Sequence, residues 1–323
     1  MRARLLLPLL GLLTLTSLAM ALLSGSLAVG PVELLHILTG GRGTGMAREV
    51  VLDLRLPRTL AAFATGALLA QAGALMQVLL RNPLADPYVL GISGGAATAA
   101  LVALGVGLGG LALSVSAFAG ALVAMILVFG LAHGGGTWSP NRLLLTGVVL
   151  AAGWGALISL LLALSPNASL RGMLFWLMGD LSGAAHPATA LTVAAAGLVL
   201  ALPLARELNV LTAGTLQAGA LGVNVARLHA AIYLLASLLT AAAVTVAGSI
   251  GFVGLVVPHA LRLLGVRDHR VLLPGAALLG GALLVLADTL ARTVAAPQQL
   301  PVGVITAALG VPLFLVLLRR GYR

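Results

Sequence analysis

The sequence predicts an all-α polytopic membrane protein with about ten transmembrane helices, some of them short and broken, and with both termini in the cytoplasm. Three observations lead to this fold class. Only 8% of the 323 residues are charged and 60% are hydrophobic, whereas soluble domains carry about 25% charged residues. The mean hydropathy is +1.13. Long apolar runs also lack the polar face that a soluble helix needs.

The apolar runs set the order of the spans. A helix needs about 20 apolar residues to cross the hydrocarbon core. The runs that reach or approach this length are 5–28, 57–80, 93–107, 111–132, 143–164, 188–204, 228–247, 251–265, 271–291 and 302–318. The third and the eighth are short and lie beside glycines, so we expect them to be tilted, broken or partly buried in protein.

The first run follows Met1-Arg2-Ala3-Arg4 and has two interpretations. A basic start and an apolar stretch are features of a signal peptide, but this stretch is longer than the usual core of about 7 to 15 residues. No small-x-small cleavage site follows it. We therefore expect an uncleaved first span rather than a removed leader.

Arginine placement orients the predicted spans. All 18 basic residues are arginine. With the N-terminus in the cytoplasm and ten alternating spans, twelve arginines fall inside and six outside, as the positive-inside rule requires. This orientation puts the long loop 29–54 outside, with a short helix at 31–38 and a glycine-rich turn. It puts the segment 206–227 inside, where glycines separate short helical runs.

Several classes of function are disfavoured by composition. A net charge of +10 is typical of nucleic-acid binding, but the arginines are scattered at the ends of apolar runs and aromatics are few, so no nucleic-acid partner is expected. Without cysteine there is no disulfide and no thiolate metal site. The histidines are dispersed without metal-ligand spacing, so no metal is expected. A membrane enzyme ranks third among the hypotheses, because no catalytic constellation is recognisable.

The absence of lysine bears on the energy source. A nucleotide-hydrolysing P-loop places a lysine on the phosphates, and this chain has none. If ATP drives transport, another polypeptide must bind it. An ion-coupled secondary transporter is the alternative, but such carriers normally place an acid near the membrane midplane. Here the acids fall in predicted loops or near span ends; Asp288, for example, is expected to pair with Arg292 four residues on.

Six ordered blocks of sequence run from about residue 50 to the C-terminus. They are Leu54-Arg55-Leu56-Pro57-Arg58, Asn82-Pro83-Leu84-Ala85-Asp86-Pro87, Gly91-Ile-Ser-Gly-Gly95, Phe175-Trp176-Leu-Met-Gly179, Gly251-Phe-Val-Gly-Leu-Val-Val-Pro258-His259 and Leu300-Pro301-Val-Gly303. Together they resemble the FecCD family, the permeases of type II ABC importers for iron–siderophore complexes, haem and cobalamin.

The resemblance implies a single permease domain, 1–323, in the bacterial inner membrane and in contact with lipid. Its expected partners are a second copy of itself, two ATP-binding cassette subunits that carry ATP and Mg, and a periplasmic substrate-binding protein. The loop 29–54 would then be periplasmic. No cofactor is expected on this chain, and nothing in the sequence separates the three chelates.

Family arginines at the periplasmic surface pair with glutamates of the binding protein. By match these are Arg55, Arg58 and Arg292, which also belong to the minority of arginines outside. Arginine suits this role because its planar fork grips a carboxylate bidentately. The alternative is that these side chains snorkel at the membrane interface.

The segment 206–227 matches the family's cytoplasmic coupling loop, which rests in a groove of the ATPase. The resemblance assigns the ATPase contacts to Leu211, Thr215, Leu216, Gln217, Leu221 and Gly222. The sequence departs from the family at Thr215 and Leu216, where acids are common, so we expect a more apolar docking.

Two further sites come from the resemblance. Asn82 and Leu84, with Pro140 and Asn141, would form the cytoplasmic gate, although Asn-Pro is also a turn signal by itself. Segment 170–187 would be a short helix near the outer entrance, where Phe175, Trp176 and Met178 line the path. An aromatic–methionine patch of this kind also suits lipid anchoring or packing.

Overall fold

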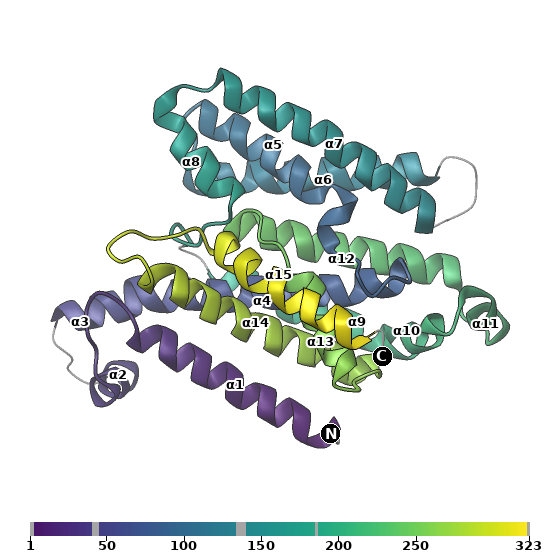
Figure 1. The fold of residues 1–323 in the computed structure, drawn as a ribbon, viewed down its shortest axis with the longest axis horizontal. Coiled ribbons are helices and arrows are strands. Elements are labelled where there is room, and N and C mark those ends of the chain that lie inside the picture. The colour runs from purple at the N-terminus through teal and green to yellow at the C-terminus, as the bar shows by residue number, and fades with distance from the viewer. Residues whose placement is uncertain (1–2, 41–44, 134–139, 185–186, 322–323) are drawn as a thin grey trace.

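The computed structural model describes residues 3–40, 45–133, 140–184 and 187–321, and within them the elements are helical (Figure 1). The α-helices are α1 Ala3–Leu23, α2 Pro31–Leu38, α3 Gly45–Glu49, α4 Leu56–Leu79, α5 Ile92–Gly105, α6 Gly110–His133, α7 Pro140–Leu164, α8 Asn167–Leu177, α9 Pro187–Ala201, α10 Ala205–Thr212, α11 Thr215–Ala220, α12 Val225–Ala247, α13 Val253–Leu263, α14 His269–Thr293 and α15 Val302–Gly321. A π-helix, η1 Val50–Arg55, and two 3-10 helices, η2 Pro87–Leu90 and η3 Leu202–Leu204, join them.

The predicted all-α membrane fold is confirmed. Among the described residues, 7 helices are long and apolar enough to cross a bilayer, and three shorter apolar helices accompany them. Each of the ten predicted runs corresponds to one of these helices. The two runs expected to be short are α5, with 14 residues, and α13, with 11. The side of the membrane on which the termini lie stays a prediction.

The helices run roughly parallel around α4 (Figure 1). Helices α5 to α8 gather on one side, and α1 and α14 lie on the other. One end of the bundle, named here the α10 end, contains α10 and α11 together with the first turns of α1 and the last turns of α15. The opposite end, named the α2 end, contains α2 and α3. The two loops that the sequence places on opposite sides of the membrane are therefore at opposite ends of the bundle.

Glycine allows α4 to touch its neighbours backbone to backbone. A Cβ at Gly66 would overlap the carbonyl oxygen of Gly280 in α14, and a Cβ at Gly73 would overlap that of Gly254 in α13. Lipid supplies no hydrophobic force between helices, so close approach through small residues is the main source of packing energy in such a bundle. This contact fixes α4, α13 and α14 as one unit.

Helices α5 and α13 are short because each crosses only part of the bundle. Segment 82–91 turns back along α4, so that Pro87 packs at Gly254 near the Leu69 carbonyl, midway along α4. Asp86 caps η2 by accepting a hydrogen bond from the Tyr88 N–H at 2.8 Å. The sequence predicts Asp86 in a loop away from the middle of the spans, whereas in the structure this loop folds back so that Asp86 lies beside the middle of α4. Irregular backbone is tolerated at such depth where protein surrounds it.

The loop 29–54 contains more helix than the sequence predicted. The short helix at 31–38 is confirmed as α2. Residues 45–55, however, continue α4 backwards through α3 and η1, so that the helical stretch Gly45–Leu79 reaches 35 residues. Part of the glycine-rich turn, residues 41–44, lies outside the described residues. The π-helical turn ends at Arg55 and directs its side chain toward the end of α1.

The contact between Gly73 and Gly254 gives a first prediction. Gly73→Ala should destabilise the bundle by about 1 to 3 kcal/mol, because the added methyl group has no space and both backbones must move apart. The unfolding free energy in mixed micelles, measured by SDS titration, checks this. Gly130→Ala is the control, since nothing lies within 4 Å of a Cβ at that position of α6. Equal stability of the two variants would contradict the prediction.

Candidate docking, gating and pathway sites

A cavity of about 730 Å³ opens at the α2 end. Its walls include all three predicted docking arginines, Arg55, Arg58 and Arg292, together with Asp53 and Gln299. Segments far apart in sequence supply them, namely η1 with the start of α4, the end of α14 and the loop that follows α14. The structure therefore brings these three sequence-predicted residues together around one cavity.

Asp288 organises two of these arginines. Its carboxylate is 1% exposed and lies 2.8 Å from Nη2 of Arg58 and 3.2 Å from Nε of Arg292. Arg58 Nε also donates to Asp288, at 3.0 Å to one oxygen and 3.1 Å to the other. The expected pairing of Asp288 with Arg292 is confirmed, and its pairing with Arg58 across the helices was missed. We call Arg58, Asp288 and Arg292 the arginine cluster; it carries one net positive charge.

The outer edges of the arginine cluster are also held. Arg58 Nη1 donates to Gln299 Oε1 at 2.7 Å, and Arg292 Nη2 donates to the Ala21 carbonyl oxygen at 3.0 Å. The two side chains keep 12% and 9% of their surface exposed. A buried ion pair is costly to leave incomplete, so Asp288 and these neighbours fix where the guanidinium groups meet the cavity.

Arg55 has a different environment. It is 5% exposed and donates to the carbonyl oxygens of Leu22, Leu23 and Leu27 at 2.8, 3.3 and 2.5 Å. The first two are terminal carbonyls of α1, which lack partners within that helix, and a cation at this end also complements the helix dipole. The guanidinium of Arg55 thus caps α1, and a docking role for Arg55 stays a prediction.

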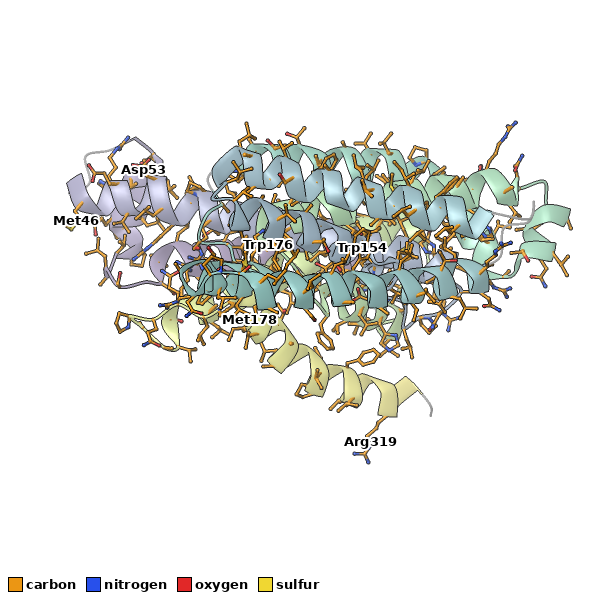
Figure 2. All side chains as sticks on the ribbon, turned by 90° about the horizontal axis from the view of Figure 1, so that it is seen from above. Met46, Asp53, Trp154, Trp176, Met178 and Arg319 are labelled. Carbon is orange, nitrogen blue, oxygen red and sulfur yellow. The ribbon has the colours of Figure 1, made fainter. Side chains whose placement is uncertain are left out.

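The predicted pathway residues surround the end of α8. The Arg171 guanidinium lies 5.6 Å from the centre of the Phe175 ring, Trp176 packs against the core, and Met178 is 37% exposed. Backbone bonds hold the turn that follows them, including Val302 N–H to the Gly179 carbonyl at 3.0 Å. Figure 2 shows Met178 where this turn meets the start of α15, and Trp176 deeper in the bundle. Of the three, Met178 is the most accessible.

The predicted gate residues lie in two segments, the turn at Asn82 and the start of α7. The Asn82 side chain accepts a hydrogen bond from the Leu84 N–H at 2.9 Å and so closes a turn, in which Leu84 is 37% exposed. Pro140 and Asn141 begin α7. The backbone after the Asn82 turn reaches α7, because a Cβ at Gly147 would lie 2.5 Å from the Val89 carbonyl oxygen. The turn interpretation of Asn82 is thereby confirmed, and its gate role stays a prediction.

The coupling segment has a buried side and an exposed tip. Leu211 of α10 is 0% exposed and faces the bundle, whereas Leu216 and Leu221 around α11 are 90% and 72% exposed. Thr215 is half-buried, and Gln217 and Gly222 are exposed. Positive φ angles at Gly214 and Gly222 end the two short helices, as the glycine stops predicted. Two large apolar side chains therefore project freely at the α10 end.

A polar contact ties α10 to the start of α14. Asn209 Nδ2 donates to Asp268 Oδ1 at 2.8 Å, and Asn209 Oδ1 accepts from the His269 backbone N–H at 3.0 Å. Asp268 is also the N-cap of α14 and accepts from the Arg270 N–H at 3.0 Å. This backbone donor and the Asn209 amide lower the pKa of Asp268, so its carboxylate stays ionised well into acidic solution.

Sequence reasoning missed Asn209 and Gln299. The cap signal of an aspartate just before the apolar run of α14 was present at Asp268. Nothing in the sequence pointed to Asn209 as its partner, 59 residues away, or to Gln299 as the partner of Arg58, 241 residues away.

Comparisons with known proteins agree with this arrangement. A family model described as the FecCD transport family matches residues 12–320. The cobalamin import system permease protein BtuC of Halobacterium salinarum is 46% identical over 276 residues, 84% of this chain and 74% of the relative. The hemin transport system permease protein HmuU of Yersinia pestis is 44% identical, covering 84% of each chain.

Among solved structures, a metal-chelate type ABC transporter in an inward-facing conformation superposes with a TM-score of 0.86. It is 30% identical in sequence, and the match covers 97% of this chain and 98% of that one. The similarity therefore extends over almost the whole of both chains.

The arginine cluster gives a second prediction. Asp288→Ala should lower the unfolding free energy by about 3 to 5 kcal/mol, because it leaves two buried guanidinium groups facing each other without a counter-ion. SDS titration in mixed micelles measures this. Asp53→Ala removes an exposed carboxylate from the wall of the same cavity and should change stability by less than about 0.5 kcal/mol. Similar losses in both variants would refute the structural role of Asp288.

Proposed function

The chain belongs to the FecCD transport family and is a permease of type II ABC importers, and from this premise we propose how it assembles and works. Two copies form a passage through the bacterial inner membrane, and a separate pair of ATPase subunits drives it. A substrate-binding protein delivers a metal chelate at the α2 end. The family match over residues 12–320 carries the assignment, and the 7 long and three shorter apolar helices follow in the expected order.

The partner copy has a suitable surface in α7. Within one subunit the buried residues of this helix are Leu143 and Gly147, and its other residues stay partly or fully exposed. Its open face exposes small residues, Ala152, Gly153, Gly155 and Ala156, beside large apolar ones such as Val149, which is 70% exposed. Small residues on a membrane helix favour contact with another helix over contact with lipid. A dimer around α7 would bring the two copies of the gate turn to the same axis.

The ATPase surface lies at the α10 end. A groove in an ATPase subunit would receive the exposed Leu216 and Leu221, while the buried Leu211 anchors α10 to the permease. Apolar side chains exposed at the tip of a polar loop are typical of a docking point. This assignment agrees with the apolar departure from the family that the sequence shows at Thr215 and Leu216.

The binding protein would dock at the α2 end. Arg58 and Arg292 line a cavity with surplus positive charge, which complements carboxylates on a partner. Charged groups held in a fixed geometry lose little freedom on docking, so a partner carboxylate would meet guanidinium groups that Asp288 and Gln299 already hold in place. Arg55 contributes indirectly by holding the end of α1 against the start of α4.

The transported molecule is a metal chelate in this proposal. The relatives are named for cobalamin and hemin, and the structural neighbour for a metal chelate. The segments 85–91 and 249–252 interrupt the α-helices inside the bundle, which suits a passage that changes shape between outward- and inward-open states. No step of covalent chemistry is assigned to this chain.

Uptake into proteoliposomes tests this function. The permease, its ATPase and its binding protein should import haem, cobalamin or a ferric hydroxamate siderophore only with ATP, and omission of the ATPase should abolish uptake. Uptake that follows a proton or sodium gradient without the ATPase would overturn the proposal in favour of a secondary transporter.

The coupling tip gives a separate prediction. Leu216→Asp should weaken association of the permease with its ATPase by about tenfold or more, because it places a charge where an apolar contact is expected. Size-exclusion chromatography and surface plasmon resonance in detergent measure the association. Met46→Asp is the control, since Met46 is 70% exposed at the opposite end (Figure 2). Unchanged association in Leu216→Asp would place the ATPase elsewhere.

A further inference from the structure

The side chain of Asn209 uses both of its polar groups to join α10 to α14. A carboxylate can only accept and a peptide N–H can only donate. The amide nitrogen therefore faces Asp268 and the amide oxygen faces the N–H of His269. His269 Nδ1 lies 2.6 Å from the same oxygen and must carry a hydrogen. We call these three residues the Asn209 clamp.

The clamp acts where α10 is already seated. Leu208 and Leu211, on either side of Asn209, are both 0% exposed. These apolar contacts set how deeply α10 lies, but apolar packing is non-directional. Hydrogen bonds to a helix cap are directional. The clamp therefore ties the first residues of α14 to α10, so that they move with α10 when the coupling segment moves.

Helix α14 leads from the clamp to the arginine cluster. It is a single helix of 25 residues, about 37 Å long at 1.5 Å per residue. Its first residue is in the clamp, and Asp288 and Arg292 lie in its last two turns. Along its length it contacts α4 at Gly280, opposite Gly66. Because this backbone contact prevents α14 from sliding along α4, a displacement at one end moves the two helices together and is carried to the other end.

We propose that Asn209 is a positioning residue for the transport cycle, which links the ATPase-docking loop through α14 to the arginine cluster at the far end of the bundle. The proposal rests on the function proposed above and adds a physical connection between its two docking surfaces. Asn209 is neither one of the exposed leucines of the coupling segment, Leu216 and Leu221, nor one of the residues that line the cavity. Its effect is therefore on the coupling between the two docking surfaces.

Linkage makes this testable. Suppose that ATP binding to the ATPase changes the affinity of the permease for the binding protein by some factor. Loss of the link through Asn209 then reduces that factor, while the affinities of the permease for the ATPase and for the binding protein, each measured alone, change little. A residue that only stabilises the fold would lower both affinities or the yield of folded protein. The two roles therefore differ in the ratio of dissociation constants with and without ATP.

The experiment uses the assembled complex in nanodiscs with a hydrolysis-deficient ATPase. The dissociation constant of the binding protein is measured without nucleotide and with ATP-Mg. Asn209→Ala should reduce the ATP-dependent ratio by about fivefold or more, the lower range of typical allosteric couplings. Its nucleotide-free dissociation constant should stay within about twofold of the wild type.

Two further variants separate the hydrogen bond from a packing defect. Asn209→Asp places two carboxylates together and should lose the coupling as Asn209→Ala does. The double variant N209D/D268N exchanges donor and acceptor and should restore it. Asn224→Ala is the matched control, because Asn224 is also a helix cap but caps α12, where it accepts from the Arg227 N–H at 3.1 Å.

Each outcome decides the inference. A wild-type ratio in Asn209→Ala and Asn209→Asp would overturn it, and so would a double variant no better than Asn209→Asp. ATP-driven uptake by the wild-type complex is measured in parallel. If uptake is normal while the variants keep their coupling, only the inference fails; if the wild type shows no ATP-driven uptake, the proposed function fails as well.

Discussion

The backbone contact of α4 with α13 and α14 is the constraint on which the rest of the structure depends. Where Gly66 meets Gly280 and Gly73 meets Gly254, no side chain separates the helices. In a membrane, close packing of this kind replaces the hydrophobic force that assembles soluble bundles. It also sets the positions of polar groups at both ends of α14, because this helix cannot slide along α4 without a clash.

The polar groups inside the bundle follow from that constraint. Arg58 reaches Asp288 only because the start of α4 and the end of α14 lie side by side. Near the other end, the Arg262 guanidinium donates to the side-chain oxygen of Gln77, so that α13 and α4 are joined again. Polar groups buried away from water must find partners within the protein. Each of these pairs both needs the close packing and reinforces it.

The same arrangement separates two kinds of arginine at the α2 end. Arg55 donates its hydrogen bonds to the carbonyl oxygens at the end of α1. Arg58 and Arg292 instead share the carboxylate of Asp288 beside the cavity. The motif 54–58 therefore supplies two arginines with different roles: Arg55 stabilises the end of α1, and Arg58 lies at the cavity. The coupling segment at the α10 end shows the same separation of roles, because Leu211 is buried and anchors the segment whereas Leu216 is exposed and projects from it.

The sequence by itself determined the membrane class, the order of the spans and the places of the two long loops, because hydrophobic length, arginine placement and glycine stops act locally along the chain. It also indicated the pairing of Asp288 with Arg292, which lie one helical turn apart. Only the tertiary structure decided that Arg55 turns inward, that Asp86 lies midway along α4, and that Asn209 meets Asp268. These contacts join residues distant in sequence, and they arise from where close-packed helices cross, which no local pattern encodes.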